Sequence, residues 1–121
     1  MTTIWRCLVL FLTPQGLWAG TDDVVTWQDV QPFFQKQCVN CHGAHGAAKG
    51  LRLDSYDAVL SGSERGVVVI SGDVNGSELI RRLRGESLPR MPFLGPKMSS
   101  EDVDFVERWI GGGLLLVEIA Q

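Results

Sequence analysis

The sequence has few histidines and cysteines and no excess of positive charge. Its 121 residues include two histidines and three cysteines, and the formal net charge is −3, from 11 basic and 14 acidic side chains. This acidic balance gives no support to a nucleic-acid-binding function, which depends on positive charge. No general base, nucleophile or pair of carboxylates stands out as a catalytic set, so we do not expect an enzyme.

The chain also lacks an apolar run long enough to cross a membrane. Its first apolar run, Cys7–Leu12, follows the single charge of Arg6 and precedes the small residues Ala19 and Gly20. This order is typical of a secretory signal peptide, whereas a membrane span needs about 20 apolar residues. We therefore expect residues 1–20 to be an export signal, cleaved after Ala19 or Gly20. The mature protein would be periplasmic or secreted, with no stable membrane span.

The rest of the chain predicts one all-α domain of three or four short helices, covering residues 21–113. Thr26, Ser77 and Ser99 are expected N-caps, and Gly62 and Gly85 are expected to end helices. The periodic apolar segments lie within residues 26–38, 53–62, 76–85 and 99–113. Completed capping boxes are expected at the first and last helices.

Between these helices the sequence predicts long loops. Residues 43–50 are rich in glycine and alanine, residues 66–73 form an apolar extended connector, and residues 88–98 contain three prolines. Such loops are unusual in a small helical bundle, and they fit a domain whose loops wrap a ligand. The apolar tail, residues 114–121, is assigned no role.

The segment Cys38-Val39-Asn40-Cys41-His42 is open to four interpretations. A structural zinc site needs four ligands that join separate parts of the chain, but the two cysteines, His42 and His45 are clustered within eight residues. A redox dithiol is favoured at a helix N-terminus after a strand, whereas this pair follows a helix. A structural disulfide would close an unusually small ring. Covalent haem attachment fits the spacing best.

In the haem interpretation the two cysteines and the histidine of the motif each contact the cofactor. Two thiols three residues apart add to the vinyl groups of one porphyrin edge, and the following histidine ligates the iron. Small residues after His42, at Gly43, Ala44 and Gly46, would let the backbone pass close to the ring. A methionine from an irregular loop is the usual second ligand in small cytochromes c, and Met91 and Met98 are the candidates.

Four further segments carry a resemblance to a known family. "VQPFFQKQCVNCHG", "KGLRLDSYDAVLSG", "SGDVNGSELIRRLRG" and "RMPFLGPKMSSEDVDFVERWIGGG" resemble, in the same order, the planctomycete-type cytochrome c domain. The resemblance implies a small cytochrome c fold around one haem c, attached through Cys38 and Cys41. It also implies His42 and Met91 as the axial ligands. Met98 stands where the family usually has leucine and is expected in the core.

Three further features are given roles. His45 is expected to be a surface histidine, because it is too close to His42 to reach the opposite face of the ring. Trp109 is expected to pack against Phe33 and Phe34. An arginine cluster is expected to pair with haem propionates, to dock an acidic redox partner, or only to form a solvated helix face. It consists of Arg81, Arg82, Arg84 and Arg90.

These features favour an exported electron carrier that cycles between Fe(III) and Fe(II), with a more positive potential than a bis-histidine haem. The alternative from another class is a haem peroxidase or gas-sensing domain in which the sixth ligand is weak or absent. A third possibility, an electron-entry subunit of a larger enzyme, differs from the first only in its redox partner.

Overall fold

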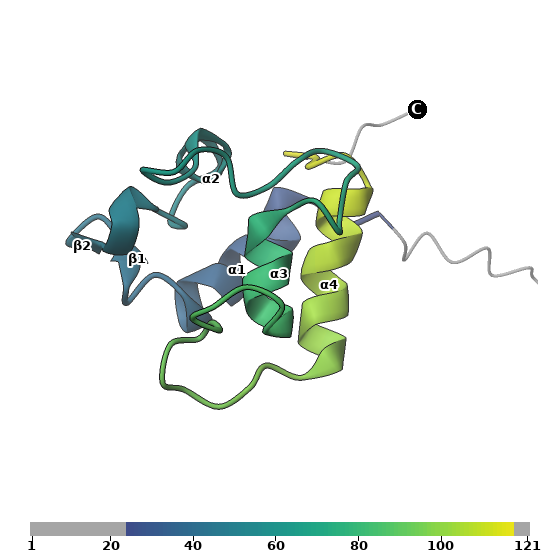
Figure 1. The fold of residues 1–121 in the computed structure, drawn as a ribbon. Coiled ribbons are helices and arrows are strands. Elements are labelled where there is room, and N and C mark those ends of the chain that lie inside the picture. The colour runs from purple at the N-terminus through teal and green to yellow at the C-terminus, as the bar shows by residue number, and fades with distance from the viewer. Residues whose placement is uncertain (1–23, 118–121) are drawn as a thin grey trace, which may run out of the picture.

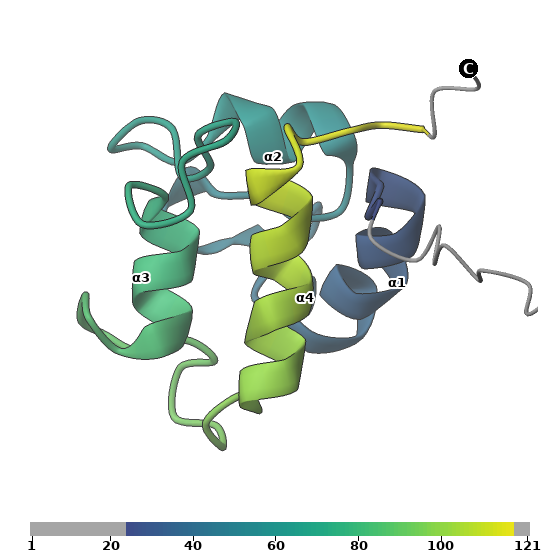
Figure 2. The same ribbon diagram turned by 90° about the vertical axis from the view of Figure 1, so that its right-hand side faces the viewer.

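The computed structural model describes residues 24–117, and the expected signal peptide lies outside them. The described part is mostly helical, as predicted. Its elements are α1 (Trp27–Gln37), β1 (His42–Gly43), β2 (Gly46–Ala47), the 3-10 turn η1 (Ala48–Gly50), α2 (Tyr56–Ser61), α3 (Glu78–Arg84) and α4 (Ser100–Gly111). Helix α4 contacts both α1 and α3. It stands beside α3 in Figure 1, and between α3 and α1 in the turned view of Figure 2. Within residues 24–117, no helix has the length and apolarity that a membrane crossing requires.

Helix α1 begins where the capping pattern predicts. The amide and the hydroxyl of Thr26 both donate to the carboxylate of Asp29, at 2.8 and 3.0 Å. Pro32 lies inside the helix, which nevertheless continues to Gln37. Val30 and Phe34, four residues apart on one face, are fully buried. The apolar periodicity of this segment therefore outweighs the cost of an interior proline.

Helices α3 and α4 begin at the predicted residues, but their caps differ from the prediction. Ser77 precedes α3, yet its hydroxyl donates to the carbonyl of Asp73 at 2.7 Å and accepts from the amide of Ile70 at 2.9 Å. It therefore holds the preceding turn instead of capping the helix. At α4 the Ser99 hydroxyl accepts from the amide of Asp102 at 3.1 Å, which confirms a hydroxyl cap without the reciprocal bond of a full box.

An aromatic cluster joins α1 and α4. The fully buried Trp109 ring lies 6.0 Å from the ring of Phe34 and 5.7 Å from the ring of Trp27, measured between centroids. The predicted packing of Trp109 against α1 is therefore confirmed through Phe34. Phe33 lies beside Phe105 instead, with ring centroids 6.4 Å apart. These side chains form part of the hydrophobic core or pack against it.

The loops follow the prediction with one exception. Residues 66–73 form an extended connector outside any strand, with Val68 and Val69 buried, and the segment before α4 is irregular. Residues 43–50, predicted as a loop, instead include three of the four paired residues of a minimal antiparallel hairpin, followed by η1. In this hairpin His42 pairs with Ala47 and Gly43 with Gly46. Each strand has only two residues, too few to give a periodic pattern in a segment rich in glycine and alanine.

The apolar tail is also part of the folded unit where the structure describes it. Leu114 is buried, and the carbonyls of Leu114 and Leu115 accept hydrogen bonds from α1, α2 and α4. No role was predicted for this stretch because two of its partners, Trp27 and Tyr56, are remote in sequence.

Candidate functional site

The cysteine motif is a tight turn that leads from α1 into β1. Cys38 is the C-cap of α1 and donates its amide to the carbonyl of Phe34 at 2.8 Å. The amides of Cys41 and His42 then both donate to the carbonyl of Cys38, at 3.2 and 2.9 Å. Cys38 is half-buried and Cys41 is exposed. The helix end therefore fixes one thiol against the core, and the turn presents the other to solvent.

The ring of His42 is oriented by the segment that follows the hairpin. Its Nδ1 lies 3.3 Å from the carbonyl oxygen of Leu51, and its own carbonyl accepts from the amide of Leu53 at 2.7 Å. A carbonyl oxygen can only accept, so this contact favours the neutral tautomer that has its proton on Nδ1 and its lone pair on Nε2. A histidine that donates from one nitrogen to a carbonyl is the usual arrangement of a metal ligand.

The two thiols do not fit a redox dithiol or a disulfide. Both are free cysteines. Burial, together with the neighbouring Cys41, raises the pKa of Cys38 to about 12. A reactive dithiol needs a lowered thiol pKa, as at a helix N-terminus. At the C-terminal end of α1, burial and the neighbouring Cys41 shift the pKa of Cys38 in the opposite direction.

A zinc site is not supported either. Among residues 24–117, no three side chains of the His, Cys, Asp and Glu types are grouped closely enough to hold a metal ion. His45, which the zinc interpretation would need as a fourth ligand, is exposed on the hairpin turn. This confirms its prediction as a surface histidine.

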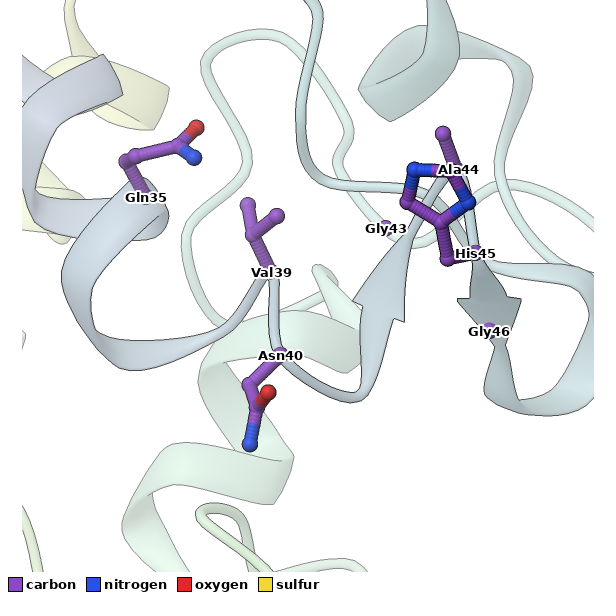
Figure 3. Close-up of a pocket in the computed structure, with 7 residues that line it drawn as sticks. All are labelled: Gln35, Val39, Asn40, Gly43, Ala44, His45 and Gly46. Carbon is purple, nitrogen blue, oxygen red and sulfur yellow. The ribbon is translucent and has the colours of Figure 1, made fainter.

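A shallow hollow of about 340 Å³ lies between the end of α1 and the hairpin (Figure 3). In this view Gln35 of α1 and His45 of the hairpin stand on opposite sides of it. Gly43 on its floor is buried, and a Cβ there would lie 2.5 Å from the carbonyl oxygen of Val39. Glycine is therefore needed at this position for the turn to pack on its own helix end, a reason that the sequence prediction did not include.

The two candidate methionines differ in their surroundings. Met98 is 7% exposed and belongs to the core, as predicted. Met91 is half-buried against the core, in the irregular loop after α3, and its amide donates to the carbonyl of Arg82 at 3.0 Å. This loop and the end of α1 lie in the lower half of both views of the fold (Figures 1 and 2). Of the two methionines, Met91 is thus the one that is not fully buried in the core.

Three of the four clustered arginines are engaged with carboxylates. Arg82 and Arg81 lie 2.7 and 3.6 Å from Glu78, and Arg84 lies 2.7 Å from Glu107. The fourth, Arg90, donates to the carbonyl of Gly95 at 3.2 Å. The pairing of Glu78 with Arg82 was missed, although their i, i+4 spacing on a helix was a sequence signal for it.

A family model described as Planctomycete cytochrome C matches residues 38–92. The match begins at Cys38 and ends one residue after Met91, so it contains the cysteine motif, α2, α3 and the start of the methionine loop. Neither the curated proteins nor the solved structures include a match to this chain.

The predicted resemblance is therefore confirmed: residues 38–92 match the family model of a planctomycete-type cytochrome c domain. A match to a cytochrome c domain points to a haem-binding electron carrier, with haem c as the implied cofactor.

Proposed function

We propose that this protein is an exported monohaem c-type cytochrome that carries single electrons. One observation carries the proposal: within the matched segment, two free thiols three residues apart precede a histidine whose Nδ1 faces a backbone carbonyl at 3.3 Å. That orientation leaves Nε2 for the iron. Haem c, when bound, supplies one-electron Fe(III)/Fe(II) chemistry.

The residues present fit the cofactor. Cys38 and Cys41 would form the thioether links, and the turn that joins them holds both backbones through the carbonyl of Cys38. His42 would supply one axial nitrogen. Met91 would supply the other ligand from a loop whose backbone is bonded to α3. A thioether ligand favours the reduced iron, so the potential would lie above that of a bis-histidine haem.

The protein would work with a redox partner. The arginine cluster remains our proposed docking surface for an acidic partner. Within it, Arg81 has the largest exposed fraction among the paired members, 46% of its side chain, and Arg90 has no carboxylate in salt-bridge range among the described residues. These two arginines are therefore the ones most available to an incoming carboxylate. Export would depend on residues 1–20.

The alternative of a peroxidase or gas sensor gains no support from the site. A peroxidase ordinarily needs an acid–base side chain beside the open coordination position. The chain's other histidine, His45, is exposed on the hairpin turn.

The test is expression of the full chain in a bacterial host that attaches c-type haem, followed by the intact mass and the visible spectra of both oxidation states. We expect the mass of the cleaved chain plus one haem, and a six-coordinate low-spin ferric spectrum with a sulfur-to-iron charge-transfer band. A chain without covalent haem would refute the cytochrome proposal. A high-spin five-coordinate spectrum would instead favour ligand binding or peroxide chemistry.

A further inference from the structure

The loop that carries Met91 is bonded to α3 from its start, where the carbonyl oxygen of Arg81 accepts from the amide of Ser87 at 3.1 Å, and two further bonds involve Arg82. The amide of Met91 donates to the carbonyl oxygen of Arg82 at 3.0 Å, and the Arg82 guanidinium reaches the carbonyl oxygen of Pro89 at 3.4 Å. The backbone and the side chain of Arg82 thus contact the loop at two positions, two residues apart. The place of Met91 therefore depends on where Arg82 holds the loop.

Arg82 is in turn held by Glu78, one helical turn earlier. Its Nε donates to Glu78 Oε1 at 2.7 Å. The second carboxylate oxygen, Oε2, accepts from the hydroxyl of Ser87 at 3.2 Å. One carboxylate therefore fixes the arginine side chain with one oxygen and the beginning of the loop with the other.

This ion pair is only partly accessible to solvent. The side chains of Arg82 and Glu78 are 21% and 34% exposed. The screening that makes most surface pairs worth little is reduced for groups this sheltered. A charge-assisted hydrogen bond that also fixes a loop orders that loop in advance. The loop then loses less conformational entropy when one of its side chains binds a ligand.

We propose that Glu78 and Arg82 are positioning residues for Met91. Neither supplies a ligand. Their ion pair holds the loop from Ser87 to Met91 against α3, so that the thioether is presented to the iron with little further ordering. This inference rests on the proposed function, because it takes Met91 as the axial ligand.

The pair between Arg84 and Glu107 provides a matched control. It has the same chemistry and a contact distance of 2.7 Å, and it starts from the same helix. It joins α3 to α4, however, and makes no bond to the loop from Ser87 to Met91. Glu107→Gln therefore removes a carboxylate–arginine pair without touching the methionine loop, whereas Glu78→Gln removes the pair that holds the loop, together with the longer contact to Arg81 at 3.6 Å.

The experiment compares Glu78→Gln, Ser87→Ala and Glu107→Gln with the wild type, all as haem-loaded full chains. Imidazole is titrated into the ferric protein, and the loss of the sulfur-to-iron band reports displacement of the methionine. We expect Glu78→Gln to bind imidazole roughly three- to tenfold more tightly, the range that one lost hydrogen bond gives. We expect Ser87→Ala to shift in the same direction by less, and Glu107→Gln to match the wild type.

Hydrogen exchange of the Met91 amide is measured on the same proteins. We expect its protection to fall in Glu78→Gln and to stay unchanged in Glu107→Gln. Equal imidazole affinity and equal protection in those two variants would overturn the positioning role. If the wild type lacks the sulfur-to-iron band, the proposed Met91 ligation fails. The exchange measurement then decides by itself whether Glu78 holds the loop, and Ser87→Ala extends that test if Glu78→Gln does not fold.

Discussion

The hydroxyl of Tyr56 donates to the carbonyl oxygen of Leu114 at 2.7 Å, across 58 residues of sequence. Next to it, the carbonyl of Leu115 accepts from the amide of Trp27 at 2.7 Å and from the indole Nε1 of Trp109 at 3.1 Å. Two consecutive carbonyls thus join the beginnings of α1 and α2 to the end of α4. The segment after α4 is the point at which these three helices are tied together.

The Tyr56 bond predicts the effect of a small substitution. Tyr56→Phe keeps the ring, which lies 6.4 Å from the ring of Trp109, but removes the hydroxyl and leaves the carbonyl of the buried Leu114 without its partner. We expect the free energy of unfolding to fall by about 1 kcal/mol, measured by urea denaturation of the haem-loaded protein. An unchanged value would mean that water replaces the hydroxyl and that this tie contributes nothing.

The two methionines predict opposite results in two assays. Met91→Ala should abolish the sulfur-to-iron band of the ferric protein. Met98→Ala should keep the band but lower the free energy of unfolding by about 2–5 kcal/mol, since Met98 is 7% exposed and lies in the core. Spectra and denaturation of both variants provide the check, each variant serving as the control for the other. Loss of the band in Met98→Ala alone would assign the iron ligand to Met98.

The thiols predict how the cofactor is retained. Cys38→Ala or Cys41→Ala should each leave one thioether link, and the double variant should release its haem when the protein is denatured. The measurement is the intact mass after denaturation. Haem that stays attached in the double variant would place the covalent link elsewhere.

The pair of Glu78 with Arg82 predicts an acid-dependent loss of stability. The hydrogen bond from Arg82 is the main cause that lowers the pKa of Glu78, with smaller contributions from Ser87 and the charge of Arg81. A lowered folded-state pKa adds stability above the unfolded value, about 4.3 for glutamate. That stability is lost as the pH falls through the folded-state value. Wild type and Glu78→Gln should therefore differ in melting temperature near neutral pH and converge in acid. A difference that persists unchanged in acid would contradict this origin.

Much of the fold could be predicted because its signals are local. The capping pattern at Thr26, the periodic apolar face of α1 and the glycine at position 85 each act within a few residues of the helix ends that they define. The cysteine motif is equally local, since both thiols and His42 lie in one turn.

The features that were missed depend on how turns and loops bring residues together outside the helices. Ser77 has the residue type of an N-cap, but the turn before it competes for the same hydroxyl through Asp73 and Ile70. The role of Leu115 depends on Trp27, at the opposite end of the domain. For Glu78, the helix spacing indicated the bond to Arg82, whereas the bond to Ser87 required the course of the loop.

The bond between the amide of Trp27 and the carbonyl of Leu115 also places the entrance and the exit of the folded unit beside each other. A unit whose ends meet can be spliced into a surface loop of a host protein without stretching either chain. The same neighbourhood suits circular permutation, in which a short linker closes the old ends and new ends are opened in an exposed loop. This domain is therefore suitable for insertion into engineered fusion proteins.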